Sequence, residues 1–191
     1  NQALQRGEYF WVDIVRDGVV LYELPQHALA AAKPLTPADA LAMAEGYLNE
    51  WLPAIGRALQ TAEDQMEKGI DDLGWRKDAA FMLHQATERA YACFLLVRTL
   101  YFPRSHNIKF LRSLAEDKEP RLIAAFPREA RIGRRRFELL KRAYVEARYS
   151  PSYEISADDL DALSNSVKRL RDIVEQLCRE RLDELRLGAE N

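Results

Sequence analysis

The sequence is poor in the side chains that bind metals or form disulfides. Its 191 residues include two cysteines and three histidines, and no group of them has the spacing of a metal site. Nothing requires Cys93 and Cys178 to be bridged, because both lie inside helical sequence patterns. We therefore expect no metal, no cofactor, and a reduced, cytoplasmic protein.

Long apolar runs and a strong charge of one sign are absent as well. No apolar stretch approaches the ~20 residues that span a bilayer, so we expect no membrane-spanning helix and no membrane partner. The net charge of −2 argues against a protein that coats nucleic acids generally. The residues that are present, 48% of them apolar, supply one sizeable core and indicate one domain, with or without an appendage.

Only one stretch of the sequence has a β pattern. Residues 8–23 alternate in character, and Asp17-Gly18 is a dipeptide typical of a tight hairpin turn. Because an isolated hairpin is marginally stable in water, the hairpin either belonged to a larger sheet or packs on the helices. The start at Asn1, without Met, favours the first alternative, in which residues 1–24 are the remnant of an upstream domain. Residues 25–35 then resemble a linker.

The pattern is helical from Thr36 to about residue 188. Thr36 and Pro37 begin the first helix, which continues to Met66, and Pro53 predicts a kink or a new segment inside it. We expect the other helices near residues 75–101, 107–115, 122–126, 129–149 and from 156 onward. The predicted fold class is all-α, an antiparallel up-and-down bundle of four long helices and one or two short ones, with a small N-terminal β-hairpin.

Three stretches, in this order, resemble the HEPN domain of fused nucleotidyltransferase–HEPN proteins. They are AAFMLHQATERAY at residues 79–91, HNIKFL at residues 106–111, and AYVEARY followed by SPSY at residues 143–153. The resemblance covers about residues 36–185. In the fused proteins a nucleotidyltransferase domain comes first and ends in a strand pair similar to the predicted hairpin.

This resemblance implies a homodimer and a nucleotidyltransferase partner, either in the same polypeptide or in a neighbouring one. Nucleotidyl transfer needs clustered carboxylates that hold divalent metal ions. The paired carboxylates of that enzyme are missing from this sequence, and Asp13 is at most a remaining third carboxylate or a polar residue on the open face of the hairpin. We expect that the chain cannot transfer nucleotides by itself.

Many HEPN domains resemble metal-independent ribonucleases with an Arg followed, four to six residues later, by a His. The imidazole is suited to take a proton from a ribose 2′-hydroxyl, and the guanidinium is suited to stabilise a phosphate. This sequence has Arg148, but Tyr153 stands where the His is expected. A phenol with a reference pKa of about 10 is a poor general base at neutral pH. The resemblance therefore implies ligand binding at Arg148, Tyr149 and Tyr153 more than cleavage.

Two histidines from elsewhere in the chain could converge on the same site. His84 and Glu88 share one face of a helix, because they are four residues apart. They are either ligand-binding residues or a local polar pair at a helix contact. His106 is either a third member of the site or a cap of the short helix that follows it.

Five arginines lie close together at the start of the penultimate helix. They are Arg128, Arg131, Arg134, Arg135 and Arg136. The cluster, above all residues 131–136, could bind RNA or nucleotide phosphates, or dock onto an acidic partner. It could also be balanced by acids of neighbouring helices, such as Glu116, Asp117 and Glu119.

Three hypotheses about function follow. The first is a non-catalytic module that binds a nucleotide or RNA, dimerises and partners a nucleotidyltransferase. The second is a toxin-like, metal-independent endoribonuclease that uses Arg148. The third is the substrate-binding half of an enzyme resembling aminoglycoside nucleotidyltransferases, in which glutamates of the bundle face an amino sugar.

Overall fold

The computed structural model describes residues 4, 9–22, 24 and 35–189. Every regular element in this described part is a helix, and the all-α prediction is confirmed. The elements are α2 (Tyr9–Asp17), α3 (Pro37–Lys68), α4 (Leu73–Thr99), α5 (Ile108–Lys118), the 3-10 helix η1 (Pro120–Ala125), α6 (Arg131–Tyr149) and α7 (Ala157–Ala189). None of the helices among the described residues is long and apolar enough to cross a bilayer.

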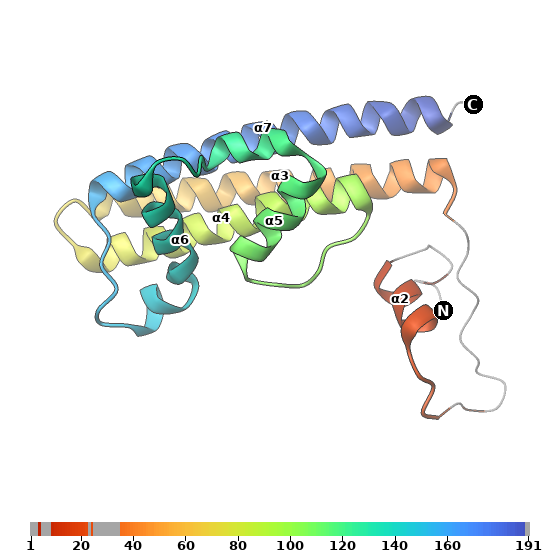
Figure 1. The fold of residues 1–191 in the computed structure, drawn as a ribbon, viewed down its shortest axis with the longest axis horizontal. Coiled ribbons are helices and arrows are strands. Elements are labelled where there is room, and N and C mark those ends of the chain that lie inside the picture. Colours follow the sequence, from red (N-terminus) through yellow and green to blue (C-terminus); the bar gives the residue numbers. More distant parts are fainter. Residues whose placement is uncertain (1–3, 5–8, 23, 25–34, 190–191) are drawn as a thin grey trace.

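Helix α4 is the centre of the bundle, because it contacts α3, α5, α6 and α7. Figure 1 shows α3, α4 and α7 side by side along the long axis of the molecule. Residues all around α4 are buried, which is why its sequence has no strong polar face. Small residues such as Ala79, Ala86 and Ala90 allow the neighbouring helices to approach it closely.

The four long helices alternate in direction, as the sequence predicted. Arg98 at the end of α4 pairs with Glu184 near the end of α7, so these two helices run the same way. In contrast, the start of α4 meets the end of α6, where the ammonium of Lys77 donates to the carbonyl of Ser150 at 3.1 Å. Helix α6 is therefore antiparallel to α4, and the last turn of α6 lies beside the start of α4.

Local sequence signals set the helix ends. The Thr36 hydroxyl accepts a hydrogen bond from the backbone N–H of Asp39 at 3.1 Å, and the Asp39 carboxylate accepts one from the Thr36 hydroxyl at 2.7 Å. Ser156 likewise accepts from the N–H of Asp159 before α7. Pro53 lies on the exposed side of α3 and starts no new segment, because the helix is continuous from Pro37 to Lys68.

The predicted N-terminal hairpin is wrong. Residues 9–17 form helix α2, and the N–H of Gly18 donates to the carbonyl of Ile14 at 2.9 Å, a bond that closes its last turn. A Cβ atom on residue 18 would lie 2.2 Å from that carbonyl oxygen, so this position requires glycine. Asp17-Gly18 therefore ends a helix and does not form a hairpin turn. Asp13 lies within α2, but the structure does not describe its side chain. Residues 25–34 of the predicted linker also lie outside the described residues.

Candidate functional site

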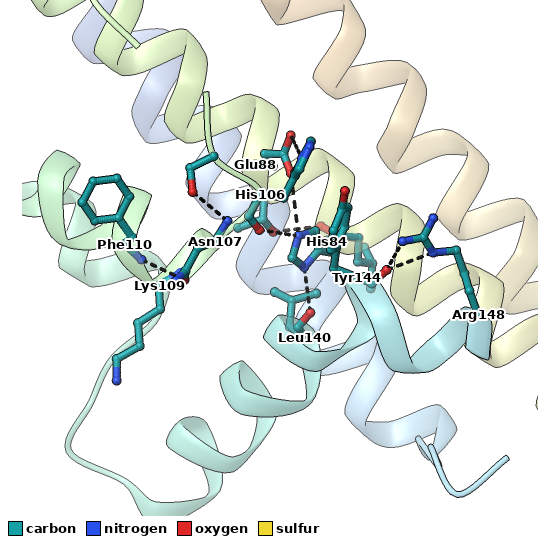
Figure 2. A network of polar contacts seen from close by, with 12 residues as sticks. His84, Glu88, His106, Asn107, Lys109, Phe110, Leu140, Tyr144 and Arg148 are labelled. Atoms are coloured by element: carbon teal, nitrogen blue, oxygen red, sulfur yellow. Dashed lines mark hydrogen bonds and ion pairs between the residues drawn. The ribbon is translucent and has the colours of Figure 1, made fainter. Parts of the chain in front are cut away.

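A polar and aromatic cluster forms where α4, the start of α5 and α6 meet (Figure 2). Tyr144 of α6 lies in its middle, and the centre of its ring is 4.7 Å from that of His106 and 5.2 Å from that of His84. Phe81, one turn before His84 on α4, stacks on the same tyrosine at 6.3 Å. Three segments that are far apart in the sequence thus meet at one ring.

His84 is the buried part of the cluster, with 1% of its surface exposed. Its Nδ1 atom lies 3.0 Å from the carbonyl oxygen of Leu140, and its Nε2 atom lies 3.2 Å from the carbonyl oxygen of His106. Burial lowers the pKa of His84, and the two carbonyls and Glu88 offset this effect only in part. The neutral His84 ring donates to one of these two carbonyls, on α6 or before α5, through the nitrogen that carries its proton, and a surface ligand does not reach it.

His106 is the exposed part of the cluster, with 61% of its side chain accessible. Its Nδ1 atom lies 3.0 and 3.1 Å from the two carboxylate oxygens of Glu88. The other ring nitrogen has no partner among the residues that the structure describes. The alternative that His106 caps the short helix is wrong, because Asn107 accepts hydrogen bonds from the N–H groups of Lys109 and Phe110 in that position.

Arg148 places a permanent positive charge beside these rings. Its guanidinium carbon lies 4.6 Å from the ring centre of Phe81 and 4.9 Å from that of Tyr144. The guanidinium also donates to the carbonyl of Tyr144 one turn earlier, at 2.9 Å from Nε. Because Arg148 and His106 both lie within 5 Å of the Tyr144 ring, they are within about 10 Å of each other.

The two other tyrosines predicted for the site lie in opposite surroundings. Tyr153 is fully buried, and its hydroxyl donates to the carbonyl of Leu139 at 3.0 Å. Burial raises its pKa, so the phenol stays protonated in the core and is not offered to a ligand. Tyr149 is 72% exposed and lies against Arg148, with 5.0 Å between the guanidinium carbon and the ring centre.

A family model for the HEPN domain matches residues 49–177, which is more than half of the chain. This chain belongs to the HEPN family. The matched region contains every residue of the cluster just described, from Phe81 in α4 to Tyr149 at the end of α6. A comparison with curated proteins finds no match.

Most of the arginine cluster of this HEPN domain is paired. Arg135 donates to Asp159 of α7 at 2.7 Å and Arg136 donates to the same carboxylate at 3.0 Å, while Arg128 pairs with Glu116. Burial alone would raise the pKa of Asp159, but the bonds from these arginines and from Ser156 outweigh it and lower the pKa.

Arg134 and Arg131 differ from the other three arginines. Arg134 donates to backbone carbonyls of residues 128 and 129, and Arg131 has no ion-pair partner in the described part of the chain. Acidic side chains on neighbouring helices thus form ion pairs with three of the five arginines, as one of the sequence interpretations anticipated.

Sequence reasoning missed two members of the site. Phe81 and Tyr144 were not among the predicted site residues, yet the guanidinium of Arg148 lies over both rings. The spacing of Tyr144, four residues before Arg148 on one helix face, was the available signal. No sequence pattern pointed to Phe81, because its contact with α6 depends on how the helices pack.

Proposed function

We propose that this HEPN domain binds single-stranded RNA at the cluster of Tyr144, His106, Tyr149 and Arg148. The observation that carries the proposal is that exposed aromatic rings lie beside a guanidinium that can still donate a hydrogen bond to a ligand. His106 and Tyr149 offer flat, exposed surfaces on which bases can stack, and such stacking contributes about 1–3 kcal/mol per base. Arg148 keeps Nη1 free of partners among the described residues, so it is available to a phosphate.

The experiment is a titration of a labelled, single-stranded oligoribonucleotide followed by fluorescence anisotropy. We expect Arg148→Ala and Tyr149→Ala to weaken binding by about tenfold each, which corresponds to 1.4 kcal/mol. Arg142→Ala and Tyr101→Ala are matched controls, because both side chains are exposed and lie outside the cluster. Equal losses in the cluster variants and the controls would contradict the proposal.

Cleavage of RNA is the second candidate, and one observation favours it. His106 offers an imidazole beside the same Tyr144 ring as Arg148, and Glu88 orients it through Nδ1. Nε2 of His106 would take the proton of a ribose 2′-hydroxyl as its oxygen attacks phosphorus, and the 5′-oxygen would leave with a proton from water. Incubation with RNA and a chelator, repeated with His106→Ala and Arg148→Ala, separates cleavage from binding alone.

Our proposal also includes a homodimer and a nucleotidyltransferase partner. Val145, which is exposed on α6, offers apolar surface to a second copy, and the oligomeric state by light scattering is the test. The nucleotidyltransferase partner, and with it the aminoglycoside alternative, loses one support because residues 9–17 are helical. Adding back an upstream domain and assaying nucleotide transfer tests both.

A further inference from the structure

A cavity of about 690 Å³ lies at one end of the bundle, between the end of α3, the start of α4 and the first part of α7. Figure 1 shows the connection from α3 to α4 beside the start of α7 at this end. None of the residues that line the cavity belongs to the cluster around Tyr144. Its volume is in the range of pockets that hold small organic molecules, about 300–1,000 Å³.

Two carboxylates of the cavity have no opposite charge beside them. Glu67 of α3 and Asp161 of α7 both line it and are exposed, and neither has an ion-pair partner within the described residues. The third carboxylate, that of Glu63, is paired with Lys168, which also lines the cavity. The cavity therefore keeps two negative charges that a bound cation can neutralise.

The other cation of the wall, Arg76, is already engaged. Its Nη1 atom donates to the carbonyls of Gly69 and Ile70, at 3.3 and 3.2 Å, which follow the end of α3. Its Nε atom is buried and has no partner among the described residues, and a ligand in the cavity does not reach it. Arg76 thus serves the connection between α3 and α4 and leaves Glu67 and Asp161 to a ligand.

The two helix ends at the cavity favour a cation as well. The last turn of α3 reaches it, and the carboxyl end of a helix carries a partial negative charge. The start of α7 carries a partial positive charge, but its first turn contains the carboxylates of Asp158 and Asp159, which offset that charge.

Ser164 supplies a buried hydroxyl to the same cavity. Only 3% of its surface is exposed, yet it lines the cavity, and its hydroxyl has no hydrogen-bond partner among the described residues. A serine inside a helix ordinarily bonds to the carbonyl four residues earlier, and this one does not. A buried hydroxyl without a partner is costly, so a ligand that donates a hydrogen bond to it is favoured.

The cavity has apolar walls between its charges. Met66, Leu160 and Ile70 line it, and Ile70 is 69% exposed. Within the described part of the chain, no three side chains are grouped so that they could hold one metal ion. Separate carboxylates with apolar surface near them fit an extended molecule that carries several charges along an aliphatic chain, better than a single metal ion.

We infer that this cavity binds an aliphatic polyamine, with ammonium groups at Glu67 and Asp161 and methylene groups along Met66 and Ile70. An ammonium carries three donors, so the group at Asp161 can also donate to the hydroxyl of Ser164, which lies one turn further along α7. This site shares no residue with the proposed RNA site, and it adds a second ligand of opposite charge.

The test is calorimetric titration of spermidine into the full chain. We expect Glu67→Gln and Asp161→Asn to weaken binding by about tenfold each, because each removes one charge from the site. Ser164→Ala should weaken it by about threefold, because it removes one acceptor. Both carboxylates are exposed, so their substitution by amides of the same shape keeps the fold.

Matched controls separate the site from general attraction to a negatively charged protein. Glu154→Gln and Asp158→Asn change the net charge by the same amount, and both side chains are exposed and lie outside the cavity. Putrescine and butylamine form a second pair, with the same four-carbon chain and either two ammonium groups or one. We expect butylamine to bind at least about tenfold more weakly than putrescine.

Spermidine binding that falls in the cavity variants and not in the controls supports the inference. Absence of binding, equal losses in cavity and control variants, equal binding of butylamine and putrescine, or displacement of spermidine by an equal concentration of Mg²⁺ each overturns it. RNA affinity is measured with Arg148→Ala and Tyr149→Ala, which leave this cavity intact, so the two proposals fail separately.

Discussion

The Nδ1 atom of His106, in the segment before α5, lies 3.0 Å from Oε2 of Glu88 in α4. Glu88 is mostly buried on α4, whereas His106 is exposed before α5. The mostly buried carboxylate of Glu88 thus fixes the orientation of the exposed His106 imidazole. The bond also connects the central helix α4 to the segment before α5. This arrangement keeps the ring stacked on Tyr144 with its other nitrogen toward solvent.

The proposed RNA site predicts a measurable role for Glu88. Glu88→Ala frees the His106 ring to rotate, and we expect affinity for a single-stranded oligoribonucleotide to fall by about threefold. Glu88→Gln keeps an oxygen that accepts from Nδ1 and should retain near wild-type affinity. Anisotropy titrations of the two variants side by side provide the check, and an equal loss in both would argue against an orienting role.

His84 makes the stability of the fold depend on pH. Because burial lowers its pKa below 6.5, the folded state disfavours the proton that the unfolded chain accepts. The free energy of unfolding has its full value above pH 6.5, and it falls as the pH drops from 6.5 toward the lowered pKa of folded His84. The charged and titratable groups that face His84 are Glu88 and His106, and Tyr144 covers the ring.

Urea unfolding at several pH values, with His84→Gln as the comparison, measures this dependence. The variant should lose part of the slope between pH 7 and the region below 6.5. A slope unchanged by His84→Gln would show that other groups cause the acid sensitivity.

What could be predicted from the sequence was mostly local. Thr36 and Ser156 cap helices in the structure as they were expected to, because a cap depends on side chains within three residues of the helix start. The apolar residues at helical spacing predicted the four long helices, because this spacing is also a local property of the sequence. The hairpin was wrong because Trp11, Ile14 and Val15 fit a helical spacing as well as a strand alternation.

The site could be predicted only in part. Arg148, His84, Glu88 and His106 were candidates. The structure brings Arg148, His84 and His106 around the ring of Tyr144, and Glu88 bonds to His106. Their convergence depends on the packing of α4 against α6, which no spacing in the sequence encodes. The partners of His84 are backbone carbonyls, one of them 56 residues away in the chain, and carbonyls leave no signature in residue identity.

Asp159 is predicted to stabilise the start of α7 through its two arginines. Its carboxylate is buried and accepts from Arg135 and Arg136. Asp159→Asn removes the negative charge, and we expect a loss of about 1–2 kcal/mol in the free energy of unfolding, since both guanidiniums are partly exposed and screened. Because the pKa of Asp159 is lowered, this contribution is present above the unfolded pKa and disappears as the pH falls through the folded one.

Chemical unfolding at neutral pH and under acid conditions tests this prediction. The difference between wild type and Asp159→Asn should shrink once the wild-type carboxyl is protonated. Asp158→Asn, one residue earlier and exposed, is the control and should change stability little. A difference that persists unchanged in acid would mean that packing, not charge, gives Asp159 its effect.

A substitution at Tyr153 distinguishes a role in the fold from a role in ligand binding. Tyr153→Phe removes only the hydroxyl and leaves the carbonyl of Leu139 without its donor, so we expect a loss of about 1 kcal/mol in stability. RNA affinity should stay within about twofold of wild type, because the ring is buried and no ligand reaches it. Melting curves and anisotropy titrations on the same preparation give both values. A large loss of affinity at unchanged stability would mean that Tyr153 contributes directly to RNA binding.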